Sequence, residues 1–280
     1  MDLDVAPGVR LRVVVEGQGE PVVLLHGHSL DLTVFDDLVP ALVDAGFRVI
    51  RYDQRGHGRS SSPPGGYRWG DHAADLRVVL EKLDAVPAHV VGLSKGGGIT
   101  LEAALRFSNL VRSLVLVGPL VPDYPLPGEF WAFFKRLAQA IREKGVKHAA
   151  QELWLSHPLL RSAWENPKSR EKLETIVFDF PAGEYLATEK DAPDRDWKLT
   201  ERLQDISCPV LVVRGEHDIP EFHQMAEFVA NKLPQAHLET VPQSGHLVPL
   251  EQPDRLAALL LRFLETTRRG QEKAPHPRRA

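Results

Sequence analysis

A serine framed by glycines is the first residue whose surroundings could do chemistry. The pattern Gly92-x-Ser94-x-Gly96 follows an apolar run at 90–93 and precedes a segment with helical spacing. A sharp turn between a strand and a helix would lift the Ser94 hydroxyl above a sheet, and its strained backbone needs neighbours without a Cβ. The N–H groups at the start of the helix favour a developing negative charge. The pattern therefore predicts a nucleophilic serine.

A base and an acid that could serve this serine follow later in the chain. A serine nucleophile needs a general base, and the base needs a group that orients it. His246 lies in a glycine-containing loop after the strand-like run 236–241, and Asp218 comes soon after the run 210–213. The order Ser94, Asp218, His246, with each residue after a strand, predicts a catalytic triad at one edge of a sheet. Asp123 is a second candidate for the acid.

Two residues beside these motifs are candidates for an oxyanion hole. Lys95 follows the serine, and His28 lies in a loop after the apolar run 22–25. Each backbone N–H donor of this kind typically contributes about 3–4 kcal/mol to transition-state stabilisation. The Lys95 ammonium either pairs with an acidic substrate or points away towards a neighbouring carboxylate. His26 and His28 could instead bind a metal, but no third ligand stands at a diagnostic spacing.

The elements that must position these residues alternate along the chain. Short apolar runs separated by helical patterns are typical of an α/β fold with a mostly parallel sheet. We expect strands at 9–15, 22–25, 48–52, 90–93, 111–117, 210–213 and 236–241. Helical spacing covers 35–45, 71–83, 99–107 and 255–264. Residues 1–119 and 201–267 are therefore predicted to form one α/β core with helices flanking the sheet.

The alternation stops between residues 120 and 200. This segment has several helical patterns, no convincing strand, and four of the five tryptophans of the chain. We expect a helical lid, inserted after the sixth core strand, that covers a pocket. The alternative is a helical subdomain that only packs on the core. Trp131, Trp154 and Trp164 are the candidate walls for an apolar group of modest size.

Composition excludes several classes of protein. With 280 residues, 43% of them hydrophobic and 26% charged, the chain is neither disordered, collagenous nor a coiled coil, and it is long enough to bury a core. A net charge of −4 argues against a nucleic-acid partner. We expect no membrane partner, because no apolar run approaches the roughly 20 residues of a membrane span. Cys208 is the single cysteine and cannot form an internal disulfide.

The two ends of the chain support two further expectations. The N-terminus has neither the basic start nor the apolar stretch of a signal peptide, so we expect a cytoplasmic protein. The expected partner of the predicted site is a small-molecule substrate. Residues 268–280 contain five Arg or Lys against one Glu, which predicts a solvated basic tail. The oligomeric state stays open.

Several motifs taken together resemble the α/β-hydrolase superfamily, from about residue 9 to residue 264. They are His26-Gly27, the segment 53–60, Gly92–Gly96, Gly215–Asp218 and Gly245-His246. The segment 53–60 resembles the branch of carboxylesterases, enol-lactonases and cofactor-free perhydrolases, where it forms a structural turn. Epoxide hydrolases and haloalkane dehalogenases of this fold have Asp as nucleophile, so Ser94 favours acyl chemistry. One departure is Lys95, where relatives often have Met or Gln.

The resemblance implies a serine hydrolase that cleaves carboxylic esters or lactones through an acyl-enzyme. This chemistry needs no metal and no organic cofactor. Hydrolysis of a carbon–carbon bond in a β-diketone-type substrate would use the same triad and is a second possibility. A non-catalytic protein that binds a small ligand on this scaffold is a third, although a pure binder has no need of all three triad residues.

Overall fold

The computed structural model describes residues 1–191 and 194–272, except for the side chains of 269–272. Within these residues the centre of the fold is an eight-stranded sheet in the order β1-β2-β4-β3-β5-β6-β7-β8. The strands are β1 (Asp2–Ala6), β2 (Val9–Glu16), β3 (Glu20–Leu25), β4 (Phe47–Tyr52), β5 (Ala88–Leu93), β6 (Val111–Val117), β7 (Val210–Gly215) and β8 (Ala236–Val241). β2 is antiparallel to β1 and β4, and the pairs from β4 to β8 are parallel. The predicted fold class is confirmed.

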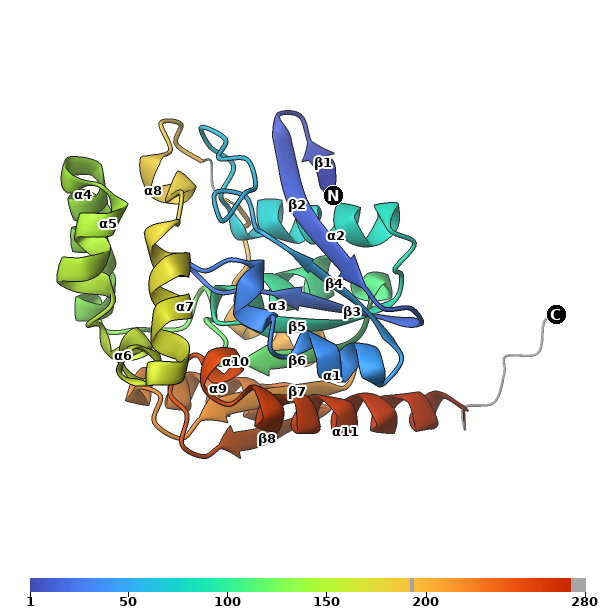
Figure 1. The fold of residues 1–280 in the computed structure, drawn as a ribbon. Helices are drawn as coiled ribbons and strands as arrows, with labels where there is room; N and C mark the ends of the chain where they lie inside the picture. Colours follow the sequence, from blue (N-terminus) through green and yellow to red (C-terminus); the bar gives the residue numbers. More distant parts are fainter. Residues whose placement is uncertain (192–193, 273–280) are drawn as a thin grey trace.

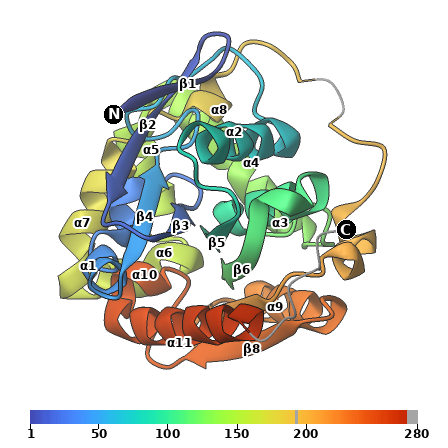
Figure 2. The same cartoon turned by 90° about the vertical axis from the view of Figure 1, so that its right-hand side faces the viewer.

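Helices cover both faces of the sheet (Figure 2). One face packs against α1 (Val39–Asp44) and α11 (Pro253–Glu272), and the other against α2 (Trp69–Lys82), α3 (Lys95–Arg106) and α9 (Pro220–Lys232). Side chains of β3 alternate between these faces: Val22 and Leu24 lie in one hydrophobic cluster, and Val23 and Leu25 lie in the other. All four are fully buried, so the continuous apolar run is the signature of a strand covered on both sides.

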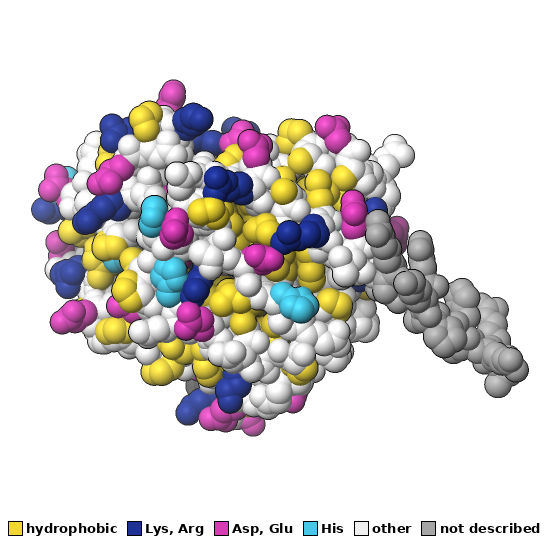
Figure 3. All heavy atoms as spheres, turned by 90° about the horizontal axis from the view of Figure 1, so that it is seen from below, with side chains coloured by type: hydrophobic (Ala, Val, Ile, Leu, Met, Phe, Trp, Pro, Cys, Tyr) yellow, Lys and Arg dark blue, Asp and Glu magenta, His cyan; other side chains and the backbone are white. Residues whose placement is uncertain are grey.

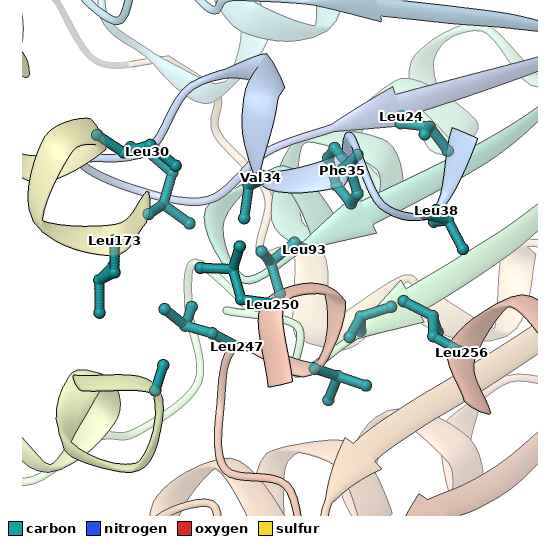
Figure 4. Close-up of a cluster of buried hydrophobic side chains, with 14 of the residues drawn as sticks. Leu24, Leu30, Val34, Phe35, Leu38, Leu93, Leu173, Leu247, Leu250 and Leu256 are labelled. Carbon is teal, nitrogen blue, oxygen red and sulfur yellow. The ribbon is translucent and has the colours of Figure 1, made fainter. Parts of the chain in front are cut away.

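Five α-helices, besides three short π- or 3-10-helical segments, stand between β6 and β7 in the described part of the chain. They are α4 (Gly128–Lys144), α5 (Val146–Ala149), α6 (Pro158–Glu165), α7 (Pro167–Phe178) and α8 (Gly183–Leu186), counted over the described residues. We call these five the inserted helices, and we call the described part of residues 120–200 that contains them the insert; the inserted helices gather at one side of the molecule (Figure 1). Leu173 of α7 belongs to the same buried cluster as Leu30, Leu247 and Leu250 of the core (Figure 4). The inserted helices therefore share a hydrophobic core with the sheet.

The last helix differs from its prediction. α11 continues to Glu272, five residues into the predicted basic tail. Arg268 explains the extension, because its Nε lies 2.5 Å from Oε2 of Glu20 and its guanidinium lies 3.9 Å from the centre of the Phe47 ring. Residues 273–280 of that prediction lie outside the described residues.

Seen from the side of α11 and β8, charged and apolar side chains are interspersed on the surface (Figure 3).

Two other differences concern the N-terminal third. The segment predicted as one helix at 35–45 is a 3-10 helix, Leu32–Phe35, followed by the shorter α1. β1 is a strand that the apolar pattern did not indicate, because it pairs at the edge of the sheet and buries none of its five residues fully. Among the described helices, none is long and apolar enough to cross a membrane.

Candidate active site

Ser94 occupies a sharp turn between β5 and α3. Its backbone has φ 52° and ψ −115°, a region that residues with a Cβ rarely adopt. The turn is possible because its neighbours are glycines. A Cβ on Gly92 would lie 2.5 Å from the carbonyl oxygen of Gly96, and a Cβ on Gly96 would lie 2.4 Å from that of Leu25. The two glycines therefore allow the predicted turn, which places Ser94 in the wall of a pocket.

His246 is held by Asp218. Its Nδ1 lies 2.8 Å from Oδ2 of Asp218, and both side chains are buried, with exposed fractions of 3% and 0%. The other carboxylate oxygen of Asp218 accepts the N–H of Ile219 at 2.8 Å. Nε2 of His246 is buried and has no hydrogen-bond partner in the described part of the chain. Because His246 and Ser94 line the same pocket, this nitrogen is available to a proton from the serine.

The carboxylate of Asp123, the second candidate acid, binds partners other than His246. Oδ2 of Asp123 accepts hydrogen bonds from Nη2 of Arg195 at 2.5 Å and from the N–H of Leu199 at 2.7 Å. The structure therefore brings Asp218, and not Asp123, to the imidazole of His246.

The ring nitrogens of His26, one of the two histidines considered as metal ligands, also have hydrogen-bond partners. Nε2 of His26 accepts the N–H of Gln54 at 3.0 Å, and its Nδ1 lies 2.8 Å from the carbonyl oxygen of Gly27. Over the residues that the structure describes, no group of three or more His, Cys, Asp or Glu side chains is arranged to hold a metal ion. His26 fixes the loop that precedes His28.

Two backbone N–H groups beside the serine have no acceptor in the described part of the chain. Within residues 1–191 and 194–272, neither His28 nor Lys95 donates a hydrogen bond from its backbone nitrogen. Both residues line the pocket together with Ser94. A Cβ on Gly27 would lie 3.2 Å from Cβ of Ser94, so the loop that leads into His28 runs directly against the serine. Free donors placed beside a nucleophile are what a developing oxyanion requires.

The side chains of the same two residues are held by adjacent residues of α8. Nζ of Lys95 lies 2.5 Å from Oε2 of Glu184, and Nε2 of His28 lies 2.8 Å from the Tyr185 hydroxyl. Burial lowers the pKa of His28 to about 4, so its ring is neutral at pH 7. Burial opposes ionisation of Glu184, but the Lys95 ammonium outweighs it and lowers the pKa of the Glu184 carboxyl.

The pocket over Ser94 has a volume of about 270 Å³. Helices α4 and α6 and the π-helix Ala150–Trp154 contribute mostly apolar and aromatic side chains to its wall, namely Phe130, Trp131, Phe134, Trp154, Leu159 and Leu160. This volume is close to the lower end of the range for small-molecule sites. It suits a small or medium-sized apolar group.

The three candidate wall tryptophans lie in different places. Trp131 and Trp154 line the pocket. Trp154 is buried and donates its indole N–H to the Ser29 hydroxyl at 2.6 Å, whereas Trp131 is 41% exposed where the pocket meets solvent. Trp164 is not among the lining residues; it packs on a hydrophobic cluster beneath the guanidinium of Arg170, 4.9 Å from its ring centre.

Sequence analysis missed a residue that holds the loop of His246. The carboxylate of Glu251 accepts the N–H groups of Gly245 at 2.8 Å and Leu247 at 3.0 Å, and the Ser162 hydroxyl of α6 donates to it as well. The signal that could have indicated it is an acidic residue five positions after a loop histidine. For Glu184 and Tyr185 no local signal exists, because their partners lie in distant segments.

Comparisons with known proteins place the chain in a family. Residues 20–253 match the family defined by the α/β-hydrolase fold. A solved thermophilic esterase from Thermogutta terrifontis is 28% identical with a TM-score of 0.80, over 92% of this chain and 94% of that one. The 3-oxoadipate enol-lactonase 2 of Acinetobacter baylyi is 28% identical, over 89% of this chain and 90% of its own length. A Synechocystis protein provisionally named a non-heme chloroperoxidase is 28% identical, over 89% and 92%.

This chain belongs to the α/β-hydrolase family, and its similarity is to a branch that contains esterases and enol-lactonases. The resemblance predicted from the motifs is confirmed. The names of the relatives cover more than one activity, so the particular reaction has to be argued from the site itself.

Proposed function

We propose that the protein is a serine hydrolase that cleaves carboxylic esters or lactones with small or medium-sized apolar acyl groups. His246 takes the proton of Ser94, whose oxygen attacks the carbonyl carbon, and Asp218 orients the imidazole and stabilises its charged form. The N–H groups of His28 and Lys95 bind the oxyanion. The alcohol leaves with the proton from His246. Water, activated by the same imidazole, then cleaves the acyl-enzyme, and no metal or organic cofactor takes part.

One observation carries this proposal: the unpaired polar groups around Ser94 match the needs of acyl transfer. Buried polar groups in proteins are nearly always hydrogen-bonded, so unpaired ones call for an explanation. Nε2 of His246 is a buried acceptor without a partner, and the N–H groups of His28 and Lys95 are donors without acceptors, in the described part of the chain. A serine proton and a carbonyl oxygen would satisfy all three.

The wall of the pocket supports the choice of substrate. Trp131, Trp154 and Phe134 provide apolar surface above the serine, and the small volume limits the size of the acyl group. The inserted helices would then act as the lid that excludes water from the reacting carbonyl.

The test is hydrolysis of p-nitrophenyl esters from acetate to octanoate, and of simple lactones, by the wild-type protein and by Ser94→Ala. We expect the wild type to turn over short and medium chains and the variant to lose roughly 10⁶-fold in kcat, as removal of a triad serine typically does. Ser156→Ala, at an exposed serine of the insert, is the matched control. Equal rates in wild type and Ser94→Ala, or turnover of a β-diketone-type substrate and of no ester or lactone, would overturn the proposal.

A further inference from the structure

The pocket wall contains two oppositely charged side chains, and they neutralise each other. Among the described residues that line the pocket, Lys95 and Glu184 are the only Lys, Arg, Asp or Glu side chains. Their Nζ and Oε2 atoms lie 2.5 Å apart. The Lys95 side chain is 7% exposed and that of Glu184 is 36% exposed. A substrate that enters this apolar pocket therefore meets an ion pair with no net charge.

The positive charge of Lys95 is balanced by the Glu184 carboxylate. In the described part of the chain, Nζ of Lys95 has no other hydrogen-bond or ion-pair partner. A buried ammonium group without a partner is unfavourable, because it loses its water and gains no interaction in return. If Glu184 lost its charge, the ammonium would face the pocket unpaired, and a carboxylate on a bound ligand would be the natural replacement.

Glu184 is also held in place by its surroundings. A Cβ on the preceding Gly183 would lie 2.6 Å from the Tyr67 hydroxyl and 2.7 Å from Cα of Gly56, so the backbone at this end of α8 is in tight contact with the core. The following residue, Tyr185, bonds to His28 through its hydroxyl. Glu184 is therefore a fixed part of the wall.

We infer that Glu184 determines specificity: by neutralising Lys95, it makes the pocket accept uncharged acyl groups and reject acyl groups that end in a carboxylate. An entering carboxylate would be repelled by Glu184 and would lose its hydration without gaining a free cation. The inference rests on the proposed ester or lactone hydrolysis and specifies the class of substrate within it.

The experiment compares two p-nitrophenyl esters of equal carbon number, the neutral hexanoate and the anionic monoester of hexanedioic acid. We expect the wild type to prefer the hexanoate in kcat/KM. Glu184→Gln frees the ammonium and should raise the ratio of anionic to neutral kcat/KM by about tenfold or more, because the substrate carboxylate then pairs with Lys95. An unchanged ratio in Glu184→Gln, or a wild type that prefers the monoester, would overturn the inference.

Three further variants separate specificity from folding. The double variant Lys95→Met/Glu184→Gln removes both charges, and its ratio should return to that of the wild type. Glu152→Gln, at an exposed carboxylate of the insert, should keep the wild-type ratio. If the single variant unfolds, the comparison is made with Lys95→Met alone, which leaves Glu184 unpaired and should lower the ratio further; no lowering would count against the inference.

A binding measurement distinguishes failure of the inference from failure of the proposed function. Calorimetry with Ser94→Ala, and with the same variant carrying Glu184→Gln, needs no turnover and uses hexanamide and the monoamide of hexanedioic acid as ligands. A relative gain for the anionic amide on adding Glu184→Gln supports the inference even if no ester is hydrolysed. Equal affinity ratios in the two variants overturn it, whatever the outcome of the ester assay.

Discussion

The carboxylate of Glu251 holds the backbone on both sides of His246. One oxygen accepts the N–H of Gly245 at 2.8 Å, and the other accepts the N–H of Leu247 at 3.0 Å. Glu251 is 8% exposed, and the Ser162 hydroxyl of α6 donates to it. His246, the proposed base, therefore lies in a loop without regular structure that one buried carboxylate holds through two backbone hydrogen bonds, and that carboxylate also contacts α6.

Glu251→Gln should impair catalysis as well as stability. The amide keeps one acceptor oxygen and replaces the other with a donor, so one of the two charge-assisted bonds, each typically worth about 1.5–3 kcal/mol, is lost. We expect a lower Tm and a fall in kcat of about 10- to 100-fold for ester hydrolysis, with a smaller change in KM. Ser162→Ala, which spares both backbone bonds, should stay close to wild type. A lower Tm with wild-type kcat would show that Glu251 stabilises only the fold.

Asp218→Asn tests the assignment of the acid. The amide oxygen can still accept the N–H of Ile219, so the fold should persist, but the amide group favours the wrong tautomer of His246. We expect kcat to fall about 10⁴-fold, as for the same change in other Ser-His-Asp triads. Thermal unfolding checks that the variant is folded. Asp123→Asn is the matched control, because Asp123 pairs with Arg195; a larger loss in that variant would reverse the assignment.

Trp131→Ala should enlarge the pocket where it meets solvent. Longer acyl chains could then bury additional methylenes, each worth about 0.8 kcal/mol or about fourfold in affinity. We expect the optimum of the p-nitrophenyl series to move to longer chains. Trp164→Phe, at a tryptophan outside the pocket lining, should leave the optimum unchanged. If both variants shift the optimum alike, the effect comes from the packing of the insert and not from the pocket wall.

The parts of the site that sequence analysis predicted are those with local causes. The turn at Ser94 follows from glycines two residues away on either side, because the clashes that they avoid involve the next strand and the start of the helix. The central parallel strands, such as β5, were predictable because fully buried strands are continuous apolar runs. The side-chain partners of Lys95 and His28 were not predictable. Glu184 stands 89 residues from Lys95, in a four-residue helix whose position depends on how the whole insert packs.

The contrast between local causes and partners distant in sequence also explains the wrong predictions at the two ends of the chain. Arg268 looked like the start of a solvated tail because its neighbours are basic. Its partner Glu20 is 248 residues away, and the two meet only once the sheet and α11 have packed together. β1 was missed for the opposite reason: its residues stay partly exposed at the sheet edge, so burial leaves no apolar run to recognise.

Stability should decline in mild acid because several histidines are buried in the neutral form. His89 in β5 is fully buried, and burial lowers its pKa to about 4, although Glu20, 3.1 Å from its Nε2, opposes the shift. The unfolded chain binds this proton with a pKa of about 6.5, so protonation favours unfolding as the pH falls from about 7 towards 4. At pH 5 this one residue should cost about 2 kcal/mol relative to pH 7.

Urea unfolding of the wild type and of His89→Gln at pH 7 and pH 5 measures this cost. The variant has no group that titrates at this position, and its amide can still bond to the Ser113 hydroxyl, the partner of Nδ1 of His89. The loss of unfolding free energy between the two pH values should therefore be about 2 kcal/mol smaller in the variant. His237→Gln, at an exposed histidine, should keep the wild-type loss. Parallel losses in wild type and His89→Gln would show that His89 does not contribute to the acid sensitivity of the fold.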